Sequence, residues 1–407
     1  MPFASWNWNL TGANADADRD AFNAMTANLW TPEQISLADD ADEIRGLSDT
    51  ERLALNHILA GLSAVESLQA SNATSALSAD AGRSRLGTSQ AVLTAVAFTE
   101  SIHTKAYSTL LAALSDNGNS NADNDNDTQS PFAWAQQSES MQEKLRLLND
   151  IYATAFDTVN SAVSGATGQA SENTDTSANS PNMSSPTEIA APNASDPDSV
   201  TPNLPDLGAL KRLAAAVLAE ALLAESGFYL PMWLSSRGSM TKSADIIRLI
   251  NRDIVASGSY LGAVYQQKLE IFDDITRESM RQYVYDLANN LYFAEEDYSY
   301  ELPYGDLGLE DDIEKFLSYN ANKALSYLGY PALFPAEISQ PNPAVTDELN
   351  DMESVNTTLK SSSLFNGTST GFAPANSTTT AAASSPTSTG ATAANKAEET
   401  SDDDWDF

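Results

Sequence analysis

The sequence predicts an all-α fold, a bundle of long helices, and three observations support this prediction. Apolar residues recur at intervals of three and four along most of the 407-residue chain, which is the period of one helix face. Convincing strand-like alternation of apolar and polar residues is missing. Several periodic segments are longer than an ordinary globular helix and are joined by short connections, which is typical of a bundle.

The elements follow from this periodicity in chain order. Helices are expected over residues 18–29, 49–72, 88–115, 133–164, 206–236, 242–271, 274–299 and 309–328. Three other stretches are polar, rich in small residues and interrupted by proline, with almost nothing to bury: 115–131, 164–203 and most of 375–397. We therefore expect a bundle domain over 1–340 with disordered inserts at 115–131 and 164–203, followed by a flexible acidic tail over 341–407.

Composition limits the partners and the chemistry. Asp and Glu outnumber Lys and Arg by 56 to 21, and the formal net charge of −35 argues against nucleic acid and anionic membranes as partners. The same acidic excess favours a halophile, because high salt screens the repulsion. Cysteine is absent, which excludes disulfides and thiol chemistry. The N-terminus lacks signal-peptide features, and Glu220 interrupts the most apolar long segment, so we expect a cytoplasmic protein.

Charged residues fall on the inward faces of three predicted helices. Glu100, His103 and Tyr107 share one apolar stripe, and Glu66 and Glu220 lie on the stripes of two other helices. An ionised carboxylate in an apolar interior is costly unless it is paired, and Arg and Lys are scarce on these faces. A satisfied core histidine is the commoner explanation of a lone Glu-x-x-His. Three inward carboxylates on separate helices nevertheless favour a divalent metal bound by three Glu and one His.

Several motifs together resemble one known family, the small (β, radical-generating) subunit of class Ib ribonucleotide reductase. They are SWNWN, NLWTPEQISLADD, AFTESIHTKAYS, ESGFYLPMWLSSR, ADIIRLINRD, SYNANKALSYLGYPALFP and the terminal SDDDWDF, and the similarity covers nearly the whole chain outside the polar inserts. The resemblance implies a ferritin-like helical bundle, usually a homodimer. In this family a dinuclear manganese or iron centre oxidises a tyrosine, and the radical starts ribonucleoside diphosphate reduction in a separate large subunit.

The resemblance also implies partners for the chain. A reduced-flavodoxin-like activator serves manganese loading in the family, and the C-terminal tail docks on the large subunit. In this sequence Trp405 and Phe407 are two large apolar side chains at the end of an acidic tail, as an anchor for a partner's groove requires.

Site residues are carried over from the family by position. Glu66 stands at the first metal ligand, which is usually Asp in this class, Glu100 and His103 match the first Glu-x-x-His pair, and Glu220 matches the next carboxylate. Tyr107 stands at the radical tyrosine.

Two further positions match the relay that links the metal-bound histidine to the subunit surface, and these are Trp30 and Asp253. Without the resemblance, packing is the preferred explanation for Tyr107 and Trp30, and a local ion pair with Arg252 is an alternative for Asp253.

The chain departs from the family pattern at two places. Residues 252–258 read RDIVASG, so that Ile254 and Ser257 replace the second Glu-x-x-His pair. We therefore expect manganese or iron, but fewer than the family's two ions per chain; Glu225, five residues after Glu220, points about 140° away from it on a helix. In the tail, LFNGTSTGF ends in Phe372, where the family places a redox-active tyrosine.

Two functions from different classes remain open on the sequence alone. The preferred one is the small subunit of ribonucleoside-diphosphate reductase, generating or holding a tyrosyl radical, with one metal ion or none. The alternative is a degenerate, non-catalytic paralogue that binds the large subunit as a regulatory or structural partner. Iron storage on the same fold is weakened by the docking tail.

Overall fold

The computed structural model describes residues 6–9, 13–83, 87–116, 130–152, 206–353 and 355. Within these ranges the secondary structure is helical, without a strand, which confirms the predicted fold class. Residues 117–129 of the first predicted insert, the whole of 164–203 and the tail from 356 onward lie outside the described residues. The predictions for Phe372, Trp405 and Phe407 lie there too.

The first half of the chain forms the N-terminal helices of the bundle. They are α1 (Ala13–Ala27), the 3₁₀ turns Pro32–Gln34 and Leu37–Asp40, α2 (Ala41–Gly46), α3 (Asp49–Leu68), α4 (Thr74–Arg83), α5 (Gly87–Asp116) and α6 (Ser130–Gln137). A π-helical turn, Gln69–Ala73, joins α3 to α4, and a further helical stretch covers 139–152.

The second half contributes the remaining helices. They are α8 (Leu207–Leu222), α9 (Glu225–Ser235), α10 (Thr241–Leu269), α11 (Asp274–Glu301), α12 (Glu310–Tyr327) and α13 (Pro343–Asn350). Several of these helices begin at a residue whose side chain caps the first turn. Asp206 caps α8 by accepting a hydrogen bond from the backbone N–H of Ala209, and Asp273 caps α11 in the same way.

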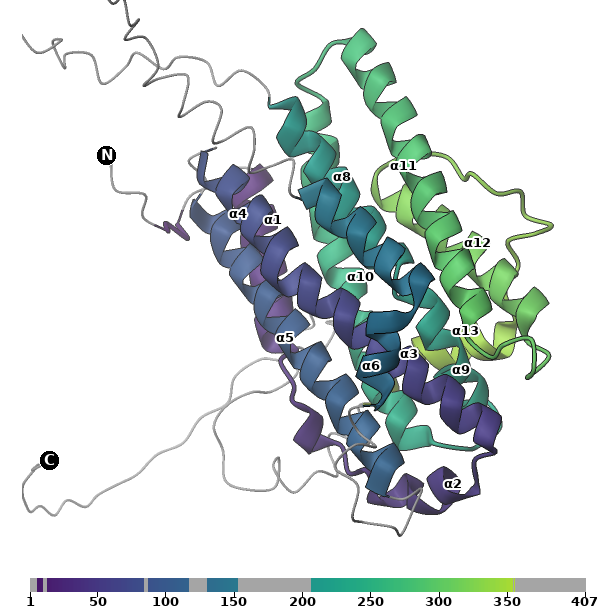
Figure 1. Ribbon diagram of the computed structural model, residues 1–407. Coiled ribbons are helices and arrows are strands. Elements are labelled where there is room, and N and C mark those ends of the chain that lie inside the picture. Colours follow the sequence, from purple (N-terminus) through teal and green to yellow (C-terminus); the bar gives the residue numbers. More distant parts are fainter. Residues whose placement is uncertain are drawn as a thin grey trace, which may run out of the picture. The chain divides into compact units, whose positions relative to one another are not determined.

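Helix α8 lies at the centre of this bundle. Nearly all of its residues are buried, because its sequence is apolar on every face except at a few positions. It packs against α10, α11 and α12, while α3 packs against α5, and α1 and α4 lie along α5 (Figure 1). In that view α11 and α12 run beside each other on one flank, and α1 and α4 occupy the other. The interior between α3, α5, α8 and α10 receives the predicted site residues.

The structure divides three of the predicted helices. The segment 49–72 contains the π-turn after Leu68, and the segment 206–236 breaks at Leu223 and Ala224 between α8 and α9. The segment 133–164 is interrupted at Ser138, and its residues 153–164 lie outside the described residues. At the second break α9 approaches α3 closely: a Cβ on Gly227 would lie 3.0 Å from the side chain of Leu62. The apolar periodicity of the sequence does not reveal these interruptions.

The packed bundle extends past residue 340, where the sequence analysis places its end. Helix α13 contacts α9 and α10, and Val345 and Leu349 are buried. Glu348 of α13 also pairs with Arg248 of α10, whose side chain is buried. The segment after 340 thus contributes to the core before the chain leaves the described region. Among the described helices, none combines the length and apolarity that a membrane span requires.

Candidate metal centre

Three of the predicted ligands converge in the interior. Glu66 comes from α3, and Glu100 and His103 come from successive turns of α5, so that all three side chains are buried. One ligand atom from each lies within 4.8 Å of the others. We call these three residues the three-residue cluster. They form the only group of three or more potential ligands of this kind in the described part of the chain.

The contacts within the cluster are close without being hydrogen bonds of normal length. His103 Nδ1 lies 3.6 Å from Glu66 Oε1 and 3.7 Å from Glu100 Oε2. Tyr107, one turn further along α5, is fully buried, and its hydroxyl donates to Glu66 Oε1 at 3.4 Å. The phenol predicted from the sequence therefore lies directly beside the cluster.

Glu220 lies beside the cluster and contacts two side chains, Glu100 and Gln69. Burial and the charge of Glu66 raise its pKa to about 7, against the lowering effect of Glu100 and Gln69. Oε1 of Glu220 accepts a hydrogen bond of 3.4 Å from Nε2 of Gln69, the first residue of the π-turn. Its charge still acts on the cluster, since it raises the pKa of Glu100. Glu220 is not a member of the three-residue cluster, although the sequence predicts a common pocket.

A chain of side chains leads from His103 toward the protein surface. His103 Nε2 lies 3.5 Å from Asp253 Oδ2, and the same oxygen accepts a 2.8 Å hydrogen bond from the indole N–H of Trp30. Arg252 donates to the other oxygen of Asp253 and also to the backbone carbonyl of Asn28. The structure thus brings Trp30, Asp253 and His103 together, in the order that the resemblance implies.

Burial and mutual repulsion shift the pKa values of the cluster. Burial, followed by the charges of Glu220 and Glu66, raises the pKa of Glu100 well above its usual range. Burial opposes ionisation of Glu66 as well, but the close side chains of Glu100 and His103 lower its pKa. Burial also acts against protonation of His103, yet Asp253, Glu100 and Glu66 raise its pKa well above the usual value. The negative charge of the neighbouring carboxylates thus raises the pKa values of both Glu100 and His103.

The cluster has the donor set of a cation site. Glu100 Oε2 and His103 Nδ1 are buried and have no hydrogen-bond partner among the described residues. Two carboxylates and an imidazole suit manganese, iron or zinc, and a divalent cation would satisfy both orphaned atoms. The residues present therefore fit one ion.

The position of a second ion offers few ligand atoms among the described residues. Ile254 offers no donor atom, and the buried hydroxyl of Ser257 donates to the backbone carbonyl of Ile254 at 3.1 Å. Glu225 is buried and neither of its carboxylate oxygens has a hydrogen-bond partner in the described residues. The charges that act on it belong to Lys323 and Glu295, and burial raises its pKa to about 7. Glu225 therefore does not take the place of the missing ligands.

Sequence reasoning missed two polar residues beside Glu220. Gln69 is buried and lies three residues after Glu66 on the same helix face, which is the signal that could have identified it. Tyr152, at the end of the stretch 139–152, is also buried, and its hydroxyl lacks a hydrogen-bond partner among the described residues. Burial and the charge of Glu220 raise the pKa of Tyr152, and the neighbouring side chain of Gln69 lowers it.

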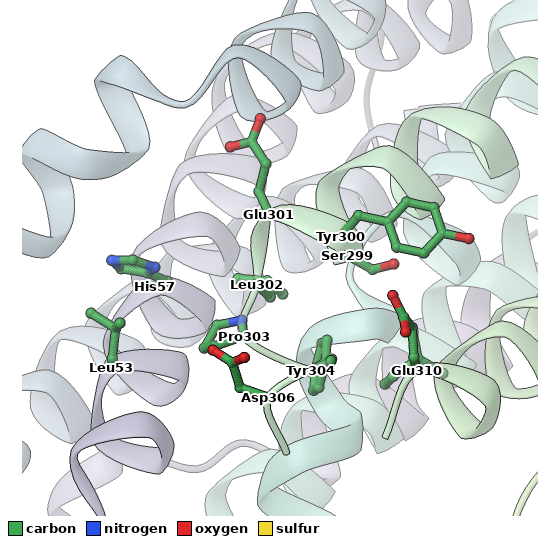
Figure 2. A pocket seen from close by; sticks show the side chains of 12 residues that line it. Leu53, His57, Ser299, Tyr300, Glu301, Leu302, Pro303, Tyr304, Asp306 and Glu310 are labelled. Atoms are coloured by element: carbon green, nitrogen blue, oxygen red, sulfur yellow. The ribbon is translucent and has the colours of Figure 1, made fainter. Parts of the chain in front are cut away.

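The chain's other histidine belongs to a separate surface pocket. His57 stacks on Trp134 with ring centroids 3.7 Å apart, and burial lowers its pKa to about 4. Figure 2 shows it at the edge of a pocket of about 300 Å³, in which the carboxylates of Glu301, Asp306 and Glu310 stand apart from one another. Because these carboxylates do not converge, the pocket has no donor set for a metal.

Comparisons with known proteins agree with this geometry. Residues 7–343 match the family described as ribonucleotide reductase, small chain. The chain is 30% identical over 401 residues to ribonucleoside-diphosphate reductase subunit beta nrdF2 of Mycobacterium tuberculosis, covering 98% of this chain and 96% of the relative. It is 29% identical over 401 residues to ribonucleoside-diphosphate reductase 2 subunit beta of Escherichia coli, covering 98% and 97%.

A solved structure gives the same result. The dimanganese(II)-NrdF of Streptococcus sanguinis superposes with a TM-score of 0.65 at 26% sequence identity, covering 85% of this chain and 99% of the other. The helical bundle, its inward carboxylates and the family match point to one assignment. The chain belongs to the ribonucleotide reductase small-chain family.

Proposed function

We propose that this chain serves as the β subunit of ribonucleoside-diphosphate reductase and holds a radical on Tyr107 for ribonucleotide reduction by a large subunit. The relatives named above are β subunits of this enzyme, which favours this role over a non-catalytic paralogue. One observation carries the assignment of the phenol. Tyr107 is fully buried, and its hydroxyl donates a hydrogen bond to Glu66, a member of the three-residue cluster.

The proposed cofactor is one manganese or iron ion held by Glu66, Glu100 and His103. Manganese is supported by the Streptococcus sanguinis relative, which is a dimanganese(II) protein. A bound manganese or iron ion, once raised to a higher oxidation state by an external oxidant, would supply the oxidising power that removal of an electron from a phenol requires. The protein contributes a dry, enclosed environment, since the side chains of the cluster are no more than 3% exposed.

Glu66 is the proposed acceptor of the phenolic proton of Tyr107. Its carboxylate accepts the hydrogen bond from Tyr107 at 3.4 Å, and its pKa is lowered, so it is ionised and ready to take the phenolic proton. Oxidation of a phenol makes its proton strongly acidic, and a nearby base removes the barrier to losing it. Glu66 thus acts as the proton acceptor for Tyr107.

Trp30 and Asp253 form the proposed link to the large subunit. Asp253 orients both the imidazole of His103 and the indole of Trp30, so that a continuous path runs from the cluster to an aromatic ring. The Trp30 and His103 rings lie 6.4 Å apart between centroids and are nearly parallel. This arrangement suits electron transfer between the buried site and the outside.

Several features of the family remain proposals for this chain. They are a homodimer, docking of the C-terminal tail on the large subunit, a flavodoxin-like activator and a cytoplasmic location. Phe372 lies outside the described residues, and we propose that radical transfer does not use a phenol at that position.

The test of the proposed function is electron paramagnetic resonance spectroscopy of protein from its native host, with a reductase assay in the presence of its large subunit. We expect a tyrosyl signal in the wild type, and loss of both signal and activity in Tyr107→Phe. Tyr265→Phe is the matched control, because Tyr265 is equally buried but its hydroxyl contacts Tyr330. Retention of the signal and activity in Tyr107→Phe would overturn the assignment.

We also propose that the protein works at high salt. The net charge is −35, so the acidic side chains repel one another at low ionic strength, and salt screens that repulsion. The melting temperature should rise with potassium chloride up to molar concentrations. A melting temperature that is independent of salt would contradict this proposal.

A further inference from the structure

The π-turn Gln69–Ala73 places an amide beside the centre. It begins three residues after Glu66, at the point where the regular hydrogen bonding of α3 ends. π-turns within helices are rare and often occur at functional sites, because they re-aim side chains without breaking the helix. Gln69 is buried, unlike its neighbours Ser71 and Asn72 in the same turn. The turn therefore directs one polar side chain into the interior.

The amide of Gln69 is aimed at Glu220. Its Nε2 donates to Glu220 Oε1 at 3.4 Å, and both side chains are buried. An amide nitrogen donates hydrogen bonds and does not ligate a metal ion, so this contact stabilises Glu220 without a cation. The amide oxygen of Gln69 and the hydroxyl of Tyr152 are both buried, and neither has a hydrogen-bond partner of normal geometry among the described residues.

Neighbouring residues leave Glu220 no competing ligand set. On α10, Ile254 has no donor atom and the hydroxyl of Ser257 is engaged by the Ile254 carbonyl. Glu225 responds to Lys323 and Glu295, which belong to other helices. Besides Glu100 of the cluster, Gln69 is the polar side chain that contacts Glu220 among the described residues, and it is the neutral one.

We propose that Gln69 is a positioning residue that holds Glu220 by an amide hydrogen bond, so that the centre takes a single divalent cation at Glu66, Glu100 and His103. This inference rests on the proposed cation centre and adds the reason for its stoichiometry. The amide of Gln69 donates a hydrogen bond to an oxygen of Glu220 without neutralising its charge. Glu220 is thereby held in place without a second ion.

The test is a Mn²⁺ titration of the full-length protein, followed by metal analysis and the electron paramagnetic resonance signal of Mn²⁺. We expect one Mn²⁺ per chain in the wild type. Gln69→Glu adds a carboxylate beside Glu220 and should raise the stoichiometry to two, with broadening of the Mn²⁺ signal by the neighbouring ion. Broadening by a neighbouring ion distinguishes a second ion in the centre from Mn²⁺ bound singly to the acidic surface.

A second variant removes the amide without adding a ligand. In Gln69→Leu the carboxylate of Glu220 loses its donor and becomes available to the ion, so Mn²⁺ should bind about tenfold more tightly, with the stoichiometry still one. Ser71→Ala, in the exposed part of the same turn, is the matched control and should leave affinity and stoichiometry unchanged.

The outcomes separate this inference from the proposed function. Two Mn²⁺ ions in the wild type would overturn the role of Gln69 and leave the cation centre intact. Unchanged stoichiometry in Gln69→Glu together with unchanged affinity in Gln69→Leu would also overturn it. If the wild type binds no divalent cation, the proposed centre itself fails, and the inference fails with it.

Discussion

Two groups of buried carboxylates in the same bundle differ in how the cost of burying a negative charge is offset. The pair of Lys144 and Glu295 joins the stretch 139–152 to α11 by an ion pair in which neither side chain is more than 2% exposed. Ser226 donates its backbone N–H to Glu295 at 3.2 Å, and the Lys144 ammonium lies 4.3 Å from the centre of the Tyr298 ring. This group contains its own cation.

The three-residue cluster and Glu220 contain no lysine or arginine. His103 is the potential cation among them, and the pKa of Glu100 is raised well above its usual range by burial and by neighbouring charge. The difference shows that the bundle tolerates a buried carboxylate in two ways. One way uses an internal ammonium, and the other, in the function that we propose, uses an external cation.

The largest expected effect comes from breaking the internal pair. Lys144→Met leaves Glu295 buried without a cation, and we expect the free energy of unfolding to fall by about 3–5 kcal/mol, measured by denaturant titration. Arg146→Met is the matched control, because Arg146 forms only exposed pairs with Glu143 and Asp150 and should change stability by less than about 1 kcal/mol. Equal effects of the two substitutions would mean that the buried pair has no special role.

A smaller effect is expected when the other group receives a cation. Mn²⁺ at a hundred times its dissociation constant should raise the free energy of unfolding by about 2.7 kcal/mol, because the ion binds only the folded cluster. His103→Ala should abolish this gain, since it removes one of the three ligand atoms. Thermal unfolding with and without Mn²⁺ measures both. Equal stabilisation of the wild type and His103→Ala would place the ion elsewhere.

The smallest expected effect concerns Glu225, which belongs to neither group. Its pKa is raised to about 7 by burial, with Glu295 raising it further and Lys323 lowering it. Because the folded protein holds this proton more tightly than the unfolded chain, the contribution to stability is complete below about pH 4.5 and is lost as the pH rises through 7.

The substitution Glu225→Gln removes this loss of stability at high pH. The variant should gain about 1 kcal/mol relative to the wild type at pH 8 and should show no gain at pH 4, because the neutral amide avoids a buried charge but also needs hydrogen bonds. Denaturant titrations at several pH values measure the difference. A gain that is the same at all pH values would show that Glu225 does not titrate in this range.

Much of the fold follows from periodicity in the sequence. The helices at 88–115, 242–271, 274–299 and 309–328 agree with α5, α10, α11 and α12 to within about two residues at each end, since long apolar stripes specify helices well. The π-turn after Leu68 and the break at Leu223 did not follow from it. Beside the break Gly227 approaches Leu62 closely, and a contact of this kind between two helices is not encoded in the periodicity of either one.

The site shows the same division. The stripe positions of Glu66, Glu100, His103 and Tyr107 predict that these side chains face inward, and the structure places them in one pocket. Glu220 faces the same interior, but the sequence gives no indication that Gln69 engages it. A hydrogen bond between residues 151 positions apart depends on the relative height of two helices, which no local pattern encodes.

The sequence by itself determined the helical class, the inward carboxylates, the single imidazole beside a phenol and the loss of the second Glu-x-x-His pair at Ile254 and Ser257. Only the tertiary structure decided which carboxylates share a cluster, which one an amide holds, and which buried acid carries its own ammonium. The physical reason is that helical periodicity fixes the direction of a side chain about its own axis, whereas distances across the core depend on how the helices slide and turn against one another.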